Sequence, residues 1–174
     1  TDRTLTLPDE AGTGLTSAGV PASAMPSGSV IQVVNSSTST VVTINNDTYT
    51  STTLSGSITP NFSTSKILVV VAQFAHTSGS NDESNYTAVT RLLRNSTEIA
   101  DIGNPAFGYF HRADFGGGFR GQTFFLGTQY LDSPNTTSEV TYSTEGRTRF
   151  DGASTLRYQQ NNAISYITLM EIAP

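Results

Sequence analysis

The sequence contains only two histidines, His76 and His111, and these are the first residues to consider for chemistry. His111 lies beside Arg112 and close to Asp114, and an imidazole with a carboxylate is a common pair for acid–base catalysis. No nucleophile motif accompanies this cluster. A zinc site would need both histidines and carboxylates from distant strands, because no close ligand spacing is present. We interpret the cluster as a polar strand end beside a loop and predict that the protein is not an enzyme.

Residues 116–121 formally match the G-x-G-x-x-G pattern of dinucleotide-binding turns. That pattern binds a pyrophosphate when it follows a strand and opens a helix. Residues 122–127 are β-prone instead, and no acidic residue follows in a strand–helix–strand setting. We therefore predict a hairpin turn at the glycines, between strands at residues 107–112 and 119–131.

An isolated acidic pair, Asp82 and Glu83, lies in the polar loop over residues 77–85. Carboxylates and loop carbonyls are the oxygen ligands that calcium prefers, so a calcium site is one alternative for this pair. Simple solvation is the other, and we favour it. The sequence thus predicts no metal and no cofactor.

Eight aromatic residues lie between Phe107 and Tyr130. Aromatic faces pack on sugar rings, and nearby Arg and Asp side chains pair with sugar hydroxyls, although we expect most of these aromatics to be core residues. The candidates for binding a receptor border the glycine-rich turn, interrupt the apolar alternation or belong to the acidic pair. They are Tyr109, His111, Arg112, Asp114, Phe115, Arg120, Tyr158, Asp82 and Glu83.

The composition indicates what kind of scaffold positions these residues. Charged residues make up 13% of the 174-residue chain, while Ser, Thr, Asn and Gly are abundant. These residue types disfavour helices and suit strands and turns. The net charge of −5 and the single lysine, Lys66, argue against a nucleic-acid partner, which requires clustered cations. No segment is apolar over a length that could span a bilayer, so we expect no membrane insertion.

Short strands separated by turn-rich gaps follow one another from Ser29 onward. The expected strands are 30–34, 41–44, 50–59, 67–75, 86–94, 98–102, 107–112, 119–131, 140–150, 156–158 and 163–172. This spacing predicts an all-β domain over residues 29–174, an antiparallel β-sandwich of jelly-roll type. Residues 1–28 have few apolar anchors, and we predict that they form a stem and linker.

Two of these strands are apolar on both faces. Residues 67–75 form a nearly unbroken apolar run, and residues 163–172 carry apolar side chains at both alternating sets of positions. A sandwich strand ordinarily turns one face to water, so we expect the second face to be buried between chains. The predicted assembly is a homotrimer, and its interface residues are Ile67, Val69, Val71, Tyr166, Thr168 and Met170.

Several stretches together resemble a known family. They are Gly28-Ser29-Val30-Ile31-Gln32-Val33-Val34, Ser57-Ile58-Thr59-Pro60, Ser65-Lys66-Ile67-Leu68-Val69, Leu131-Asp132-Ser133-Pro134-Asn135-Thr136-Thr137 and Ile167-Thr168-Leu169-Met170-Glu171-Ile172. They span residues 28–174 and resemble small β domains of phage structural proteins, especially from marine and cyanobacterial phages. The segment Arg3-Thr4-Leu5-Thr6-Leu7-Pro8-Asp9-Glu10-Ala11-Gly12-Thr13 is similar to shaft segments that precede the distal domains of tail fibres.

The resemblance implies a trimeric tail-fibre tip on the virion, joined to other virion components through its N-terminal side. It implies no catalytic residues. Three copies would display the loops around residues 77–85 and 114–118 to a host-surface glycan or protein, with a gain in avidity. A head fibre or capsid decoration protein with a purely structural role is the alternative, and a glycan depolymerase with paired carboxylates is a third. Because the sequence begins at Thr1 without an initiator methionine, we expect a processed product or a piece of a longer protein.

Overall fold

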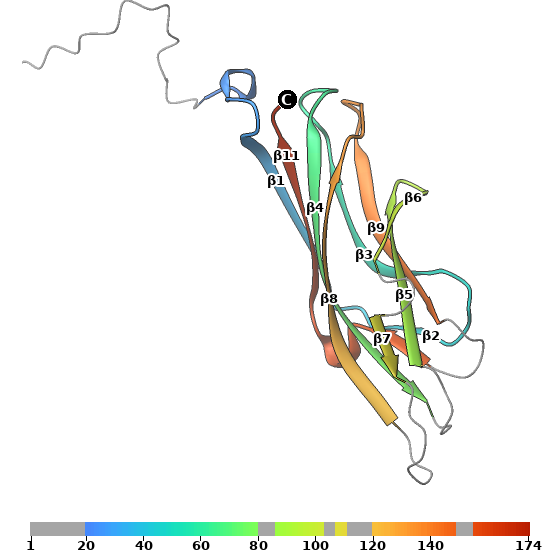
Figure 1. The fold of residues 1–174 in the computed structure, drawn as a ribbon. Helices are drawn as coiled ribbons and strands as arrows, with labels where there is room; N and C mark the ends of the chain where they lie inside the picture. The colour runs from blue at the N-terminus through green and yellow to red at the C-terminus, as the bar shows by residue number, and fades with distance from the viewer. Residues whose placement is uncertain (1–19, 80–85, 103–106, 111–119, 149–154) are drawn as a thin grey trace, which may run out of the picture.

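The computed structural model describes residues 20–79, 86–102, 107–110, 120–148 and 155–174, and these form an all-β structure, as predicted (Figure 1). The strands are β1 (Val30–Thr38), β2 (Val42–Ile44), β3 (Thr50–Ile58), β4 (Lys66–Gly79), β5 (Tyr86–Arg94), β6 (Thr97–Asp101), β7 (Phe107–Phe110), β8 (Arg120–Asp132), β9 (Val140–Thr148), β10 (Thr155–Tyr158) and β11 (Ser165–Ile172). Two 3-10 turns, Ala22–Ala24 and Gln160–Asn162, are the helical elements of these ranges. None of the described helical segments could cross a membrane.

The strands form two antiparallel sheets that pack as a sandwich, which confirms that part of the prediction. Sheet one has the order β1-β11-β4-β8. β4 is longer than β11, and beyond the end of β11 its same edge pairs with β10, which pairs in turn with β2. Sheet two has the order β3-β9-β5-β6, and β7 pairs with β5 beyond β6.

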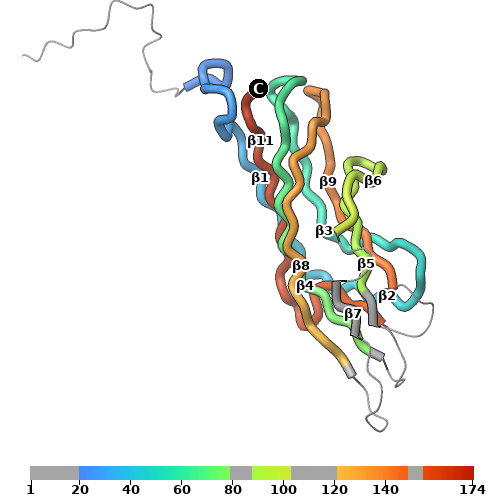
Figure 2. The backbone as a smooth tube through the Cα atoms, viewed as in Figure 1, coloured from blue at the N-terminus to red at the C-terminus, as the bar shows by residue number. Residues whose placement is uncertain are grey.

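The pairing of strands is nested along the chain. β1 pairs with β11, β3 with β9, β4 with β8 and β5 with β6. Successive strands therefore alternate repeatedly between the sheets, and the two long strands β4 and β8 run side by side (Figure 2).

The predicted hairpin around residues 116–118 is wrong. β7 pairs with β5 in sheet two, whereas β8 pairs with β4 in sheet one, so the two strands belong to different sheets. Both are aromatic-rich and adjacent in sequence, and local sequence favours pairing between neighbours. The long-range register of β8 along the whole of β4 takes the place of that local pairing.

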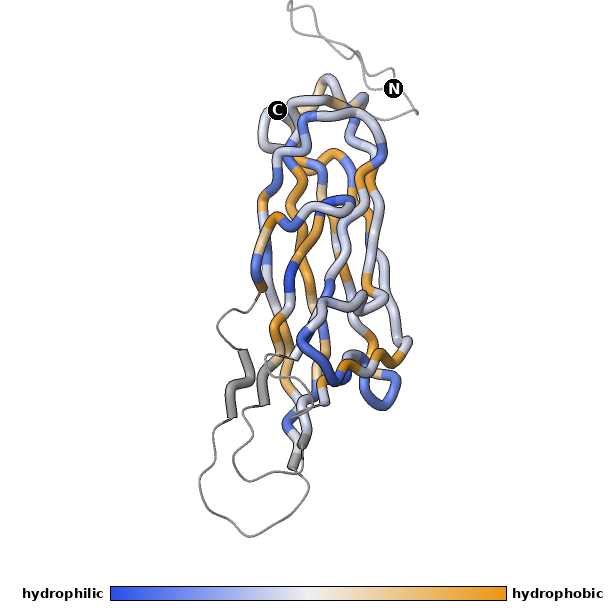
Figure 3. The backbone as a smooth tube through the Cα atoms, turned by 90° about the vertical axis from the view of Figure 1, so that its right-hand side faces the viewer, coloured by the Kyte–Doolittle hydropathy of each residue, from blue (hydrophilic) through white to orange (hydrophobic). Residues whose placement is uncertain are grey.

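The interior holds two apolar clusters. One is built around Ile67, Val69 and Val71 of β4 with residues of both sheets, and the other around Leu126, Leu156 and Tyr158. Buried polar side chains lie along the same strands, including Gln73, whose Oε1 accepts a 3.1 Å hydrogen bond from the Thr144 hydroxyl. Hydrophobic residues are concentrated on the strands, and hydrophilic residues lie both between them on the strands and in connecting loops (Figure 3).

Tyr158 of β10 reaches across the interior and packs against Gly146 of β9. A Cβ atom at position 146 would overlap the ring and hydroxyl of Tyr158. The hydroxyl instead shares a 2.6 Å hydrogen bond with Thr90. A glycine within a strand therefore marks a close approach between the two sheets.

Candidate functional site

The outer face of sheet two has the polarity expected of a sandwich in water. The outward positions of β3 and β9 carry Ser, Thr, Glu and Arg side chains. Arg91 of β5 bonds to Glu98 at 3.0 Å and to Glu145 at 2.6 Å, and its guanidinium lies 3.8 Å from the centroid of the Tyr49 ring. These exposed or half-exposed ion pairs form a hydrated surface, which contributes little to stability.

The outer face of sheet one is different, because apolar side chains predominate on it. Four strands bring side chains into rows across it. One row runs from Val33 of β1 through Met170 of β11 and Leu68 of β4 to Leu131 of β8. A second apolar pair, Phe74 and Phe125, lies further along β4 and β8. Polar side chains of Asn35, Thr168 and Gln129 form another row across the surface, and the Asn35 amide donates to the Thr168 hydroxyl at 2.7 Å. We call this surface the sheet-one face.

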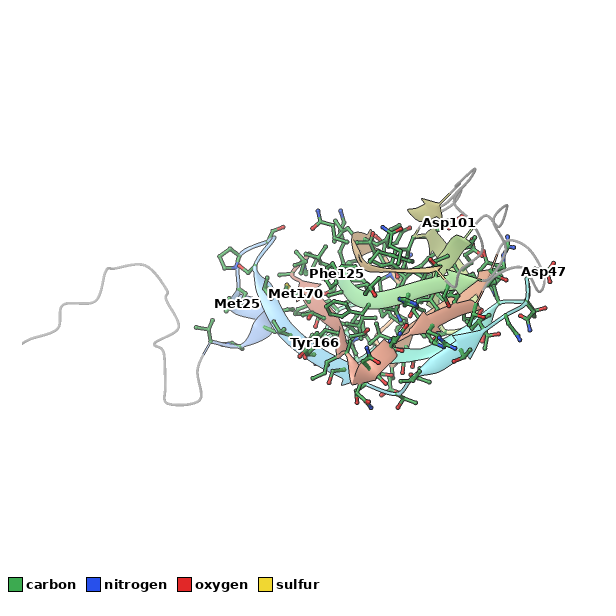
Figure 4. The ribbon with its side chains drawn as sticks, turned by 90° about the horizontal axis from the view of Figure 1, so that it is seen from below. Met25, Asp47, Asp101, Phe125, Tyr166 and Met170 are labelled. Atoms are coloured by element: carbon green, nitrogen blue, oxygen red, sulfur yellow. The ribbon has the colours of Figure 1, made fainter. Side chains whose placement is uncertain are left out.

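Several large apolar side chains on this face or at its margin are strongly exposed. They are Val33 at 57%, Phe125 at 54%, Leu131 at 52%, Val30 at 46%, Ile164 at 46% and Tyr166 at 42%. Figure 4 shows Met170, Tyr166 and Phe125 toward one side of the sandwich and Asp101 and Asp47 toward the other. Exposed apolar side chains that gather on one face mark a candidate interaction site.

The sheet-one face is also almost free of charge. Among the described side chains at outward positions of β1, β4, β8 and β11, Lys66 at one end is the single ionised group. His76 lies on the same side of β4 and hydrogen-bonds through Nδ1 to the Thr123 hydroxyl at 3.0 Å. Burial, aided by Arg157 of β10, lowers the pKa of His76 below 6.5, so its imidazole is neutral at pH 7. Arg157, the outward register partner of His76 on β10, adds a cation near this end, so the described part of the face is uncharged between Lys66 and Arg157.

A shallow hollow lies within this face, where small residues meet. Ala72 and Gly127 are register partners on β4 and β8, and with Val70, Phe125 and Gln129 they line the hollow. The Phe125 ring is held edge-on against Phe74, with 5.2 Å between the ring centroids. A fixed aromatic side chain thus stands next to an unfilled depression.

The structure divides the predicted trimer-interface residues into two sets. Tyr166, Thr168 and Met170 lie on the sheet-one face and are exposed or partly exposed. Ile67, Val69 and Val71 are at most 2% exposed because they point into the sandwich, so their assignment to an interface is wrong. Their neighbours Leu68, Val70 and Ala72 occupy the outward face of β4 instead.

One predicted receptor-binding residue is buried in the core. Tyr158 is 0% exposed and its hydroxyl bonds to Thr90, so it is unavailable to a partner and that prediction is wrong. Burial raises the pKa of this phenol above its ordinary value. The sequence reasoning placed Tyr158 outside because it interrupts an apolar alternation, but Gly146 on the facing strand makes room for its ring.

The remaining receptor candidates fall on parts of the chain whose side chains the structure does not describe. Tyr109 belongs to β7 and Arg120 begins β8, and for both the backbone alone is described. The structure places β7 and the start of β8 at the end of the sandwich opposite the C-terminus (Figure 1). The other candidates lie outside the described residues. They are His111, Arg112, Asp114, Phe115, Asp82 and Glu83.

The sequence reasoning missed most of the sheet-one face. Val33, Phe125 and Leu131 were not singled out, although residues 121–131 are uncharged and rich in apolar side chains. That absence of charge on a long strand was the signal that could have found them, because exposed strands usually carry charged residues.

The described part of the chain contains no group of three or more His, Asp or Glu side chains that could hold a metal ion. Glu98 and Glu145 both bind Arg91, while Asp132 bonds to Arg94 at 3.0 Å and to the Tyr142 hydroxyl at 2.7 Å. These carboxylates therefore serve ion pairs and hydrogen bonds that hold strands and loops together.

Comparison with known proteins identifies no family and gives a weak structural likeness. No protein-family model and no curated protein sequence matches the chain. Among solved structures, the chain is similar to dimeric latent PorU from Porphyromonas gingivalis, with a TM-score of 0.31 and 10% sequence identity. The match covers 85% of this chain and 14% of the PorU chain. A likeness at this level carries no functional argument.

Proposed function

We propose that this chain is a non-enzymatic virion module, the distal domain of a phage tail fibre, which assembles as a homotrimer and binds a receptor on the host surface. The observation that carries the proposal is the uncovered sheet-one face. Apolar surface that the chain does not bury itself is stabilised when another chain covers it. The resemblance of residues 28–174 to phage structural β domains supports the same assignment.

The strand order supports a jelly roll as the finer description of the fold. In a jelly roll, eight strands pair first with last and second with second-last, so that a long folded ribbon wraps into two sheets. The nested pairs β1·β11, β3·β9, β4·β8 and β5·β6 follow that scheme. Viral capsid proteins and lectins use this architecture, although a fold alone does not determine function.

The orientation of the sandwich relative to its N-terminal segment suits a fibre tip. The Gly28 N–H donates to the Ala173 carbonyl at 3.0 Å, and the Ala173 N–H donates to the Ser29 carbonyl at 2.8 Å. The segment that leads into β1 is therefore anchored beside the C-terminus. The end of β4 and the start of β8 lie at the opposite end (Figure 1). A stem attached before residue 29 would hold that opposite end outermost, toward a host receptor.

A head fibre or capsid decoration protein is the competing proposal, because it would use the same face for assembly without binding a host. Adsorption separates the two. The purified chain is labelled and incubated with cells of a strain on which a phage carrying this protein forms plaques. We expect the chain to bind these cells and to slow phage adsorption in competition.

A matched control for this experiment is a resistant strain that has lost the receptor, to which the labelled chain should not bind. Absence of binding and of competition on the sensitive strain would overturn the receptor proposal. Particles that lack the protein but adsorb normally, and that break down faster on heating, would then favour the decoration role.

A further inference from the structure

We infer that the partner covering the sheet-one face is a second copy of this chain, and that the contact is centred on the hollow at Ala72 and Gly127 with β8 at its rim. This inference rests on the self-association in the proposed function, and it assigns that association to one face, one strand edge and named residues.

Charge permits a second copy to approach this face, whereas it opposes contact between the acidic surfaces of two copies. Every copy carries a net charge of −5, so two copies repel each other wherever their acidic surfaces approach. Among the described acidic residues, Glu98, Asp101 and Glu145 belong to strands of sheet two. Asp132 of β8 and Glu171 of β11 belong to sheet one, but both are buried on its inner side. The sheet-one face carries no described carboxylate at its outward positions, and it is therefore a surface where like-charged copies can meet without opposing anions.

The edge strands of sheet two are protected against pairing with another chain, in contrast to the edge strand β8 of sheet one. β6, at one edge of sheet two, is five residues long and contains Glu98 and Asp101, while β3 at the other edge has a bulge at Thr53, where φ is +65°. Short length, charge and bulges are the features that protect edge strands from pairing with other chains.

Strand β8 lacks those protections. In the described structure it pairs on one side only, with β4, in an unbroken register of 13 residues. Between Arg120 and Asp132 it contains no charged residue and no proline. A long, regular and uncharged edge beside an apolar face is stable against aggregation when a defined neighbour covers it.

The shape of the face fits a copy of itself. It presents both a depression, at Ala72 and Gly127, and protruding apolar side chains, at Phe125 and Tyr166. An interface between identical chains needs both features on the surface of one chain, because each copy supplies the protrusion that fills the hollow of another.

The size of the face is sufficient for a specific contact. Strand spacing of about 4.8 Å and a rise of about 3.3 Å per residue make the four-stranded region roughly 20 Å wide and 26 Å long over β11. Two such faces bury on the order of 1,000 Å², the lower bound for a biological interface. A trimer, in which each copy meets two neighbours, can bury more.

Sedimentation velocity of the full chain at micromolar concentration tests the inference with three variants. Gly127→Arg fills the hollow, and a Cβ there would make ordinary contacts with Phe125, the closest at 3.4 Å, so the fold tolerates it. Leu131→Glu places a charge on the exposed row of the same face. Ser55→Arg on the outer side of sheet two is the control matched to Gly127→Arg, because it adds the same positive charge to an exposed strand position. Circular dichroism melting shows that each variant is folded.

We expect the wild-type chain and Ser55→Arg to associate equally, while Gly127→Arg and Leu131→Glu weaken association by about 100-fold, since each leaves a charge in an apolar contact. A wild-type dimer that is lost in the same variants would support this interface and contradict the proposed trimer. Association that survives both variants would overturn the interface and leave the trimer proposal intact. A monomeric wild-type chain would overturn both this inference and the proposed homotrimer, while receptor binding would still be decided by the adsorption experiment.

Discussion

Two neighbouring valines on the central strand β4 provide a direct test of which face of this strand is the core. Val69 is 0% exposed inside the sandwich, whereas Val70 lies on the sheet-one face and is partly exposed. Val69→Ala and Val70→Ala remove the same two methyl groups from adjacent positions of one strand. The intrinsic preference for strand changes equally in the two variants, so their difference reports burial alone.

The expected magnitudes follow from the apolar atoms that each variant removes from a packed environment. Two buried methyl groups are worth about 1.6 kcal/mol in transfer free energy, and the cavity they leave raises the cost of Val69→Ala to about 2–3 kcal/mol. At Val70 the monomer loses only part of this transfer free energy, because the side chain is partly exposed. The substitution also leaves no enclosed cavity. We therefore expect Val70→Ala to cost about 1 kcal/mol or less in the monomer.

Urea denaturation is the assay, followed by far-UV circular dichroism because the chain contains no tryptophan. Measurements at low protein concentration report the monomer, and measurements at higher concentration show whether the cost of Val70→Ala grows, as it should when another copy covers this face. Equal losses for the two variants at low concentration, or a larger loss for Val70→Ala, would refute the assignment of the core face of β4.

Two further predictions concern tyrosines of the core. Burial, together with a hydrogen bond to Asp132, raises the pKa of Tyr142 above its ordinary 10.0, so the folded state holds this proton more tightly than the unfolded state. That stabilisation is complete below pH 10 and is lost as the pH rises further. Tyr142→Phe should therefore cost about 1–3 kcal/mol of unfolding free energy at pH 7 and reduce the loss of stability above pH 10. Urea midpoints measured from pH 7 to 11 test both expectations. Gly146→Ala should destabilise the fold by about 3 kcal/mol or more in the same assay, because the new methyl group overlaps Tyr158.

Each of these predictions has an internal control. Tyr130→Phe removes a partly buried phenol on β8 and leaves the hydrogen bond between Tyr142 and Asp132 in place, so it should cost less than Tyr142→Phe at pH 7. An unchanged pH profile for Tyr142→Phe would contradict the role given to its phenol. Tyr158→Leu should cost less in a Gly146→Ala background than in the wild type, because the ring that the methyl group strikes is gone. Additive costs would show that the two residues do not meet.

Much of the fold could be predicted from the sequence because strand patterns are local. Alternation and β-branched runs located β4 and β11, and the same patterns showed that both faces of each strand are apolar. Those doubly apolar strands also led to the prediction that another chain covers part of the surface.

The choice between the two faces of β4 was beyond the sequence, because Ile67 and Leu68 are chemically equivalent as core residues. Register settles it: Leu68 pairs between Met170 and Leu131, outside the sandwich, and Ile67 packs within. A shift of one residue exchanges the two faces of a strand, so an error in register reassigns every interface residue on it. On β11 the predicted interface residues Tyr166, Thr168 and Met170 do lie on the outer face, although the inward set contains the buried Ser165 and Glu171.

Long-range pairing also decided the positions of β7, β8 and Tyr158. The sequence by itself determined that this is an all-β chain with more apolar surface than one sandwich needs. Only the tertiary structure decided where that surplus lies, because it depends on which strands pair and in what register. Those contacts join residues far apart in the chain, such as Tyr158 with Gly146 and Leu131 with Leu68, and no local pattern encodes them.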